Sequence, residues 1–210
     1  LRATRSFAQA IFSELTDRYY SLPALALATI EEDPDTADIV FDDFPSVGLD
    51  ADAQRVLFRA WLRQHLERRS FRPDGAETRE LGEGWAHPQG INAARIEQVL
   101  PNRFDRYLAH VLSDDTVKVE EVSKWFQHVV RDKGLLHFES DLYYLQLQGL
   151  SLHLRLDANW LRCQDCARIH PEALANVCPA CLGAVVEVDP DYLDARTGFY
   201  RQQVRRAFDE

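Results

Sequence analysis

Methionine is absent from the 210-residue sequence, and so is any long hydrophobic run. The most apolar segment covers residues 22–30, far fewer than the ~20 residues of a transmembrane helix. Its alanine and leucine residues favour a buried helix, and no signal-peptide pattern precedes it. We therefore expect a cytoplasmic protein with no membrane partner. Because translation begins at methionine and this sequence begins at Leu1, we also expect a piece from the interior of a longer chain.

Sequence signatures of catalysis are missing as well. There is no Gly-x4-Gly-Lys-Ser/Thr phosphate-binding loop, no His-Glu-x2-His, no Gly-x-Ser-x-Gly and no Gly-x-Gly-x2-Gly. The seven histidines are scattered singly along the chain. These absences exclude the common ATPase, zinc-protease, hydrolase and dinucleotide-binding motifs, and we expect no catalytic residue in these 210 residues.

Negative charge is concentrated in one stretch. The chain has 34 acidic and 24 basic residues, a formal charge of −10, and residues 31–54 hold nine acids and no base. The remaining residues are nearly neutral, so the net charge does not exclude nucleic-acid binding. We expect residues 31–54 to form a solvated acidic loop. Two other interpretations are that this stretch covers the arginine-rich helix after it, or that it binds a basic protein partner.

Hydrophobic periodicity predicts a mainly helical α+β fold. Asp50 or Asp52 is expected to cap the second helix. Three short helices followed by a hairpin, in the middle of the chain, are the winged-helix pattern. The expected helices cover residues 4–30, 51–70, 91–100, 104–112 and 119–133, followed by a hairpin over 135–138 and 143–147 and a strand over 150–156.

All four cysteines lie in one segment with the pattern Cys-x2-Cys-x11-Cys-x2-Cys. Two Cys-x2-Cys turns can direct four thiolates at one metal ion at ~2.3 Å, which is typical of a zinc ribbon. Four cysteine ligands leave no open coordination position, so the metal is expected to be structural. His170 lies between the pairs and could replace a ligand, although we expect it at the surface. The predicted Zn²⁺ ligands are Cys163, Cys166, Cys178 and Cys181.

Other uses of four cysteines fit this sequence less well. Two disulfides need an oxidising compartment, and a thioredoxin-type redox site needs only one cysteine pair. The spacing also differs from that of ferredoxin iron–sulfur clusters.

Proline and glycine residues in 71–90 indicate the main internal boundary. The expected regions are a helical region over 1–82 that includes the acidic loop, a winged-helix-like module over 90–157, a zinc ribbon over 158–190, and a C-terminal helix over 191–210 that leads into the parent chain.

Several cations are candidate nucleic-acid contacts. Three arginines at four-residue steps form a stripe on the helix of residues 51–70, where a solvated surface and phosphate contact are both possible interpretations. The third helix of a winged-helix fold often enters the major groove, but Glu120 and Glu121 give the corresponding helix a mixed polar face. The candidates are Arg55, Arg59, Arg63, Lys118, Lys124, Arg131 and Lys133.

A longer motif surrounds the cysteines: Trp160-Leu-Arg-Cys163-Gln-Asp-Cys166-Ala-Arg-Ile-His170, then Cys178-Pro-Ala-Cys181-Leu-Gly183, Tyr192 and Thr197-Gly-Phe-Tyr200. This motif resembles a segment of large bacterial superfamily 2 DEAD/DEAH-box helicases. They include the helicase subunit of DISARM-type phage-defence systems and relatives with the MZB zinc-binding domain. The detailed match covers about residues 158–200, and the order of the modules before it agrees loosely.

The resemblance implies a non-catalytic accessory region of an ATP-dependent DNA helicase or translocase. Such a region braces the motor and guides DNA, while the remaining helicase domains of the parent chain bind ATP. The resemblance carries over the four cysteines as zinc ligands, but it fixes none of the basic candidates. Two alternatives come from other classes: a stand-alone winged-helix and zinc-ribbon DNA-binding regulator, and a protein–protein adaptor that binds through residues 31–54.

Overall fold

The computed structural model describes residues 22–68, 70–72, 89–146, 149–156, 159–189, 191–193, 195, 198, 201–203 and 206. It has the predicted α+β fold, in which a largely helical part precedes small sheets and the cysteine segment. The part of the helix expected over residues 4–30 that precedes residue 22 lies outside the described residues. No helix among the described residues is both long enough and apolar enough to cross a membrane.

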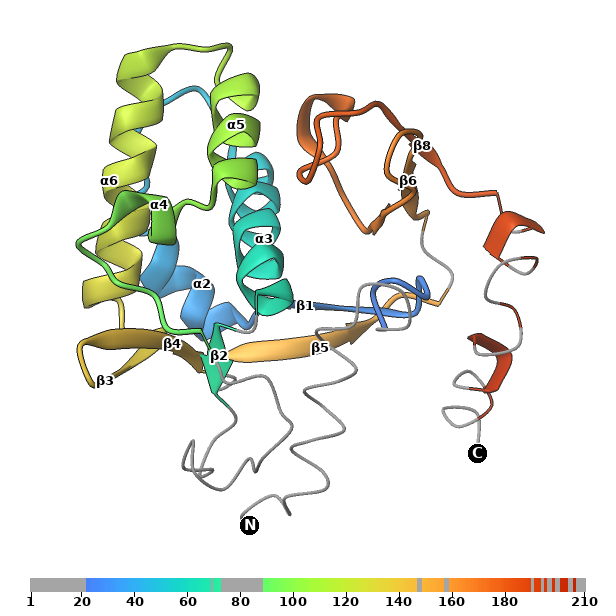
Figure 1. The fold of residues 1–210 in the computed structure, drawn as a ribbon, viewed down its shortest axis with the longest axis horizontal. Coiled ribbons are helices and arrows are strands. Elements are labelled where there is room, and N and C mark those ends of the chain that lie inside the picture. The colour runs from blue at the N-terminus through green and yellow to red at the C-terminus, as the bar shows by residue number, and fades with distance from the viewer. Residues whose placement is uncertain are drawn as a thin grey trace.

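Three helices stand side by side and enclose the main hydrophobic core (Figure 1). The core contains fully buried aromatic side chains from each of them, among which Trp61, Phe104 and Phe126 are in ring contact. These helices confirm three of the predicted ones to within a few residues. They are α3 (Ala51–Glu67), α5 (Asn102–Val111) and α6 (Thr116–Asp132), and the shorter α2 (Pro34–Phe41) and α4 (Ile96–Val99) pack beside them.

The N-terminus of α3 is capped as the sequence predicts. The Asp50 carboxylate accepts a hydrogen bond from the Ala53 N–H at 2.8 Å and satisfies one of the free donors of the first turn. Farther along α3, the Trp61 indole donates to the Val99 carbonyl at 2.7 Å. This bond ties the middle of α3 to α4.

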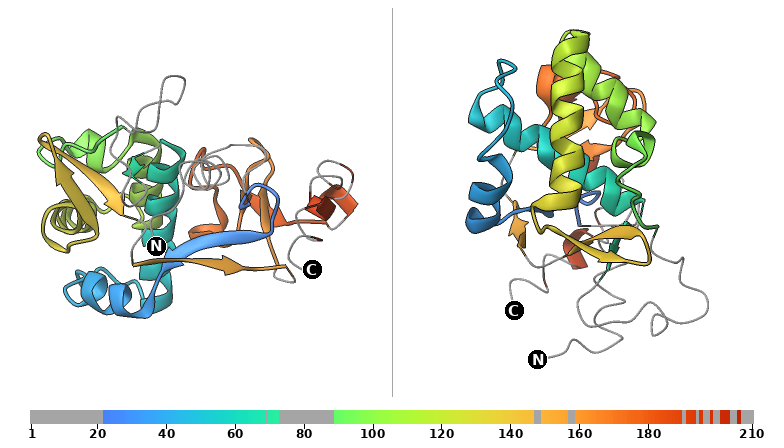
Figure 2. Two further views of the ribbon diagram at one scale, coloured as in Figure 1. Left: turned by 90° about the horizontal axis from the view of Figure 1, so that it is seen from below. Right: turned by 90° about the vertical axis from the view of Figure 1, so that its left-hand side faces the viewer.

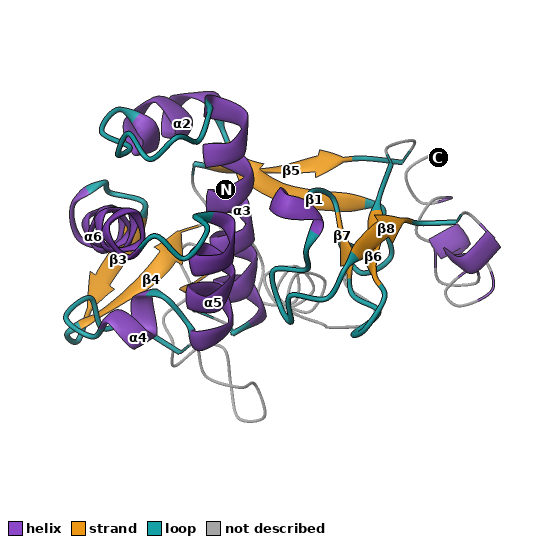
Figure 3. Cartoon of the chain, turned by 90° about the horizontal axis from the view of Figure 1, so that it is seen from above, coloured by secondary structure: helices purple, strands orange, loops and turns teal. Residues whose placement is uncertain are grey.

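The strands form three small sheets (Figures 2 and 3). A long antiparallel ribbon of β1 (Ala28–Glu32) and β5 (Leu150–Leu154) runs from the helices toward the cysteine segment. The predicted hairpin is β3 (Leu136–Glu139) with β4 (Leu142–Gln146), and β2 (Phe71–Arg72) adds to it in parallel. The third sheet has the order β7 (Ile169–His170), β6 (Leu161–Cys163) and β8 (Val185–Glu187), and the 3₁₀ turn η1 (Leu174–Asn176) lies between β7 and β8.

The helix expected over residues 22–30 is wrong in the part that the structure describes. Residues 22–27 form a turn in which the Leu27 N–H donates to the Leu22 carbonyl, and Ala26 has a left-handed φ of 56°. Residues 28–32 are β1, and every residue of this strand is buried. Pairing with β5, a partner far along the chain, outweighs the local helical preference of the alanine and leucine residues.

The helix expected over residues 91–100 is only α4 (Ile96–Val99). Ile91 instead exchanges two backbone hydrogen bonds with Tyr143 of the β3–β4 hairpin, at 2.8 and 2.9 Å. The Asn92 side chain accepts from the Ala94 N–H and favours a turn there. The observed order is nevertheless three helices followed by a hairpin.

The acidic stretch is not a solvated loop along its whole length. Glu31 and Glu32 end β1 and are 4% exposed, and the residues after Asp33 form α2. The Asp33 carboxylate caps α2 by accepting from the Thr36 N–H at 2.8 Å. Loop structure is limited to the segment between α2 and α3, and of the nine acids in 31–54 only Glu31 and Glu32 are buried.

One hydrophobic core spans both sides of residues 71–90. Leu57 and Trp61 of α3 belong to the same buried cluster as Tyr107 of α5 and Val129 of α6. The region before the expected boundary and the three helices after it therefore share their core. Toward the C-terminus, Leu193 packs with Trp160 and Ala26 in a separate small cluster, and every described residue from 191 to 206 has helical geometry.

Candidate metal centre

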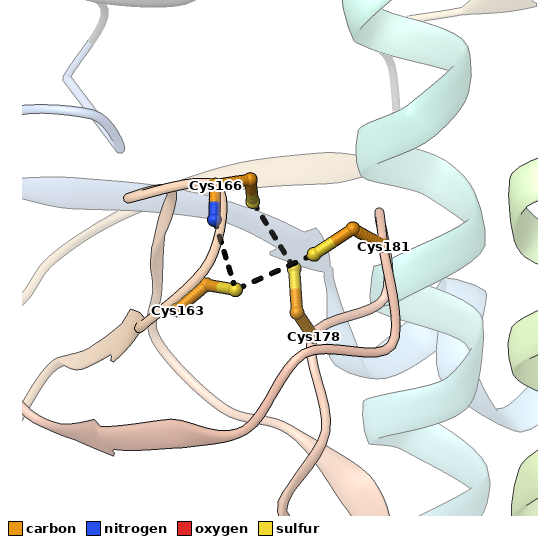
Figure 4. Close-up of side chains that lie close together, drawn as sticks. All are labelled: Cys163, Cys166, Cys178 and Cys181. Carbon is orange, nitrogen blue, oxygen red and sulfur yellow. Dashed lines mark hydrogen bonds between the residues drawn. The ribbon is translucent and has the colours of Figure 1, made fainter.

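The structure brings the four cysteines together (Figure 4). Their sulfur atoms all lie within 4.8 Å of one another, with 3.4 Å between Cys163 and Cys181 and 3.7 Å between Cys166 and Cys178. A tetrahedron of sulfurs at the usual zinc–sulfur distance of 2.3 Å has edges of about 3.8 Å. None of the four cysteines is in a disulfide. The cluster can therefore hold one metal ion without rearrangement of the chain.

Two turns of matching geometry supply these sulfurs. In each turn the first cysteine accepts at its carbonyl from the N–H four residues later, and donates its own N–H to the carbonyl five residues later. The fourth residue after the first cysteine has a left-handed φ in both turns, 57° at Ala167 and 66° at Leu182. Backbone N–H groups of Cys166 and Ala180 also point at sulfur, at 3.5 and 3.4 Å. These donors favour thiolates over thiols at this site.

The chemistry of the donors fits a cation. Burial raises the pKa of the Cys178 thiol well above its ordinary value, and burial also raises the pKa of Cys181. At Cys163 burial opposes ionisation, but the hydrogen bond from the Cys166 backbone and other local donors lower the pKa. Four adjacent thiolates repel one another, so a positive ion is needed to hold all of them deprotonated.

His170 lies next to the cluster rather than at the surface, which corrects the sequence-based expectation. Its side chain is 4% exposed, and Nε2 is 3.2 Å from the Cys178 sulfur. Burial, with Arg63 and Arg168 nearby, lowers the pKa of His170 well below its ordinary value and favours the neutral ring. A neutral ring protonated at Nε2 donates a hydrogen bond to the Cys178 sulfur, which is the role of a second-sphere residue.

Helix α3 holds the cysteine segment against the rest of the protein. Gln64 donates to the Pro179 carbonyl at 3.0 Å, beside Cys178, and Arg63 donates to the Ile169 carbonyl at 2.6 Å. The cysteine segment in turn supplies Arg168, whose guanidinium forms an ion pair with Glu67 of α3 at 2.6 Å. The arginine stripe predicted on this helix therefore faces the cysteine segment and β1.

Arg59 is the centre of a partly buried ion-pair network. It binds Glu32 with two nitrogens at 2.9 and 3.0 Å, and it also contacts Glu31 at 2.9 Å and Glu172 at 3.1 Å. Arg155, which follows β5, forms ion pairs with two of these carboxylates, Glu31 at 2.7 Å and Glu172 at 2.8 Å. Glu172 lies between the two cysteine pairs, so the network links the cysteine segment to β1, α3 and β5.

The acidic stretch thus pairs with the arginine-rich helix that follows it. Arg55 lies at the edge of the network, 3.5 Å from Glu32 and 41% exposed at its side chain, with its guanidinium over the Phe41 ring. Asp42 and Asp43, in the loop after α2, reach α6 instead, where Asp43 accepts from the Trp125 indole at 3.0 Å.

The seven basic candidates do not form one surface. Arg55, Arg59 and Arg63 lie on α3. The other four lie on α6 or, for Lys133, directly at its C-terminal end, and α6 stands on the far side of the helical core from the cysteine segment (Figure 1). Each candidate on α6 has a partner within the chain: Lys118 pairs with Asp115, Lys124 with Glu120, Arg131 with the Gln127 carbonyl, and Lys133 with Asp42 and Asp43.

Sequence reasoning missed three residues around the centre and placed a fourth, His170, at the surface. Gln64, Arg155 and Glu172 all make contacts that hold the cysteine segment. Gln64 had a visible signal, since it is a polar residue on the apolar face of its helix. Glu172 and Arg155 had none, because their partners are distant in the chain.

Known proteins offer no further guide to this site: no protein-family model, no curated protein and no solved structure matches the chain.

Proposed function

We propose that Cys163, Cys166, Cys178 and Cys181 bind one structural zinc ion, and that this chain is a non-catalytic accessory region of an ATP-dependent DNA helicase or translocase. The observation that carries the zinc part of the proposal is the cluster of four sulfurs, held against α3 by the hydrogen bond from Gln64. Four thiolates fill the coordination sphere of zinc and leave no position for a substrate or an activated water. The ion would supply folding energy to the segment around it. Free thiols of this kind suit the reducing cytoplasm.

The helicase setting comes from the resemblance of residues 158–200 and the order of the modules before them. In that setting the chain braces the motor domains, which are its partners and bind ATP, as in the phage-defence helicases that the motif resembles. The intramolecular pairing of the basic candidates favours bracing over direct DNA contact, because Arg59 and Lys133 are already engaged by two or more carboxylates.

The second candidate function is a DNA-binding regulator. It is favoured by the order of α4, α5, α6 and the β3–β4 hairpin, and by the exposure of Lys124, whose side chain is 69% exposed. An exposed ion pair such as Lys124 with Glu120 is weak, and contact with phosphate could replace it.

DNA binding separates the two candidates. For the purified, zinc-loaded chain, we expect fluorescence anisotropy with labelled single- and double-stranded DNA to show no affinity tighter than roughly 10⁻⁴ M at physiological salt. The charge reversals Lys124→Glu and Arg131→Glu should leave this weak binding unchanged. Micromolar, salt-dependent binding that the reversals abolish would contradict the bracing role and favour the regulator.

The coding sequence that precedes Leu1 tests the helicase assignment separately. A bracing region predicts that RecA-like domains with a phosphate-binding loop are encoded upstream in the same gene. A gene that encodes no such motor would contradict the assignment and leave the zinc site untouched.

A further inference from the structure

Arg63 is a half-buried cation, and one nitrogen of its guanidinium is buried without a partner. Its Nη2 donates to the Ile169 carbonyl at 2.6 Å, while Nη1 is buried and has no hydrogen-bond partner among the described residues. Within the part of the chain that the structure describes, no carboxylate lies within 4.0 Å of it. Burial lowers the pKa of Arg63, but a guanidinium keeps its charge in proteins. An unpaired buried charge is strongly unfavourable.

The nearest acid does not resolve this imbalance. Glu67 lies one turn farther along α3, and its carboxylate is already bound by Arg168 at 2.6 Å. Glu67 is therefore paired with Arg168, and Arg63 has no carboxylate partner among the described residues.

The other side of Arg63 faces the cysteine segment. The carbonyl that it binds belongs to Ile169, and the next residue, His170, contacts the Cys178 sulfur at 3.2 Å. The neighbouring Gln64 binds the carbonyl of Pro179, which follows Cys178. Arg63 and Cys178 are also close enough to affect each other electrostatically. Arg63 thus contacts the stretch of chain that carries His170, close to the sulfur cluster.

We propose that the loaded metal centre is the missing counter-charge of Arg63, and that Arg63 is a positioning residue for the metal. This inference rests on the proposed zinc site. One Zn²⁺ with four thiolates has a net charge of −2, whereas four neutral thiols have none. The half-buried guanidinium is therefore compensated when the metal is bound and uncompensated when it is absent, so its charge favours the loaded state.

The test compares zinc affinity with stability in the absence of metal. Arg63→Met removes the charge, and we expect zinc to bind roughly 10- to 100-fold more weakly, as for other second-sphere changes. The metal-free chain should keep its stability or gain some, because the variant no longer has a half-buried cation without a carboxylate partner. Zinc affinity is measured by competition with a chromophoric chelator, and stability by urea unfolding with excess chelator present.

Three further variants make the test specific. Arg63→Gln keeps an N–H donor for the Ile169 carbonyl without the charge, so it should show the same loss of affinity and serves if Arg63→Met does not fold. Arg63→Lys keeps the charge and should bind zinc within about threefold of the wild type. Arg131→Met removes an exposed cation from α6 and should leave zinc affinity unchanged.

Two results would overturn the inference in distinguishable ways. If the charge-removing variants bind zinc as tightly as the wild type, or destabilise the loaded and metal-free chains equally, Arg63 is only a packing residue and the zinc site stands. If the wild-type chain binds no zinc, the proposed function fails together with the inference.

Discussion

Chelation of the metal is expected to lower the free energy of unfolding of the zinc-loaded chain by about 4 kcal/mol, the linkage value for free zinc at a thousandfold excess over its dissociation constant. The cysteine segment has little hydrophobic core at its centre. Its sheet consists of strands of two or three residues, and the buried residues around the cysteines are Cys163, Cys178 and Ala180, while Trp160 and Ile169 pack in a separate small cluster. The ion therefore replaces the hydrophobic core that this segment lacks.

The loss of structure after chelation should be confined to the cysteine segment and the contacts that it makes. The main core lies among α3, α5 and α6 and includes none of the cysteines, so helical circular dichroism should persist after chelation. Protease sensitivity should rise between Cys163 and Cys181. Urea unfolding with and without chelator gives the free energies, and Cys178→Ser, which removes a buried ligand, is the matched control because chelator should not change its stability. An identical unfolding curve for the wild-type chain with and without chelator would contradict a structural metal.

Arg59→Met is expected to destabilise the chain by about 3–5 kcal/mol, the range for removal of one partner from a buried ion pair. The Arg59 side chain is 18% exposed, and the Glu32 and Glu31 side chains are 0% and 6% exposed. Burial alone would lower the pKa of Arg59, but the bonds and charges of Glu32, Glu31 and Glu172 raise it above its ordinary value. The variant would leave Glu31 and Glu172 with Arg155, and the buried Glu32 with only the more distant Arg55.

Arg55→Met is the control for this experiment. Arg55 lies on the same face of α3 and contacts Glu32, but its side chain is 41% exposed, so its loss should cost no more than about 1 kcal/mol. Adding Glu32→Gln to Arg59→Met should restore part of the stability, since it removes one unpaired charge, and urea unfolding measures all four proteins. If Arg55→Met and Arg59→Met lower the free energy of unfolding equally, the ion-pair network is not buried in solution.

Local sequence was sufficient where the determining contacts are close in the chain. The Asp50 cap, α5, α6, the β3–β4 hairpin and the cysteine cluster were all predictable, because each depends on residues a few positions apart. The local backbone of each Cys-x2-Cys turn places its two sulfur atoms, and the second turn supplies the other two sulfurs of the site.

Long-range pairing explains what could not be predicted. Residues 28–32 look helical in isolation, and only β5, more than a hundred residues later, makes them a strand. The sequence alone predicts that Glu31 and Glu32 are solvated. In the fold they are buried in ion pairs with Arg59 and Arg155. The arginine stripe was correctly placed on a helix, but a one-dimensional pattern does not show whether such a stripe faces solvent, phosphate or another part of the chain.

X-ray absorption at the zinc edge tests the closed four-thiolate centre most directly. For the purified, zinc-loaded chain we expect four sulfur scatterers at about 2.3 Å and no nitrogen or oxygen. His170, whose Nε2 is 3.2 Å from the Cys178 sulfur, is the residue that could replace a cysteine. A shell of three sulfurs and one nitrogen, or a chain that retains no zinc, would contradict the centre described above.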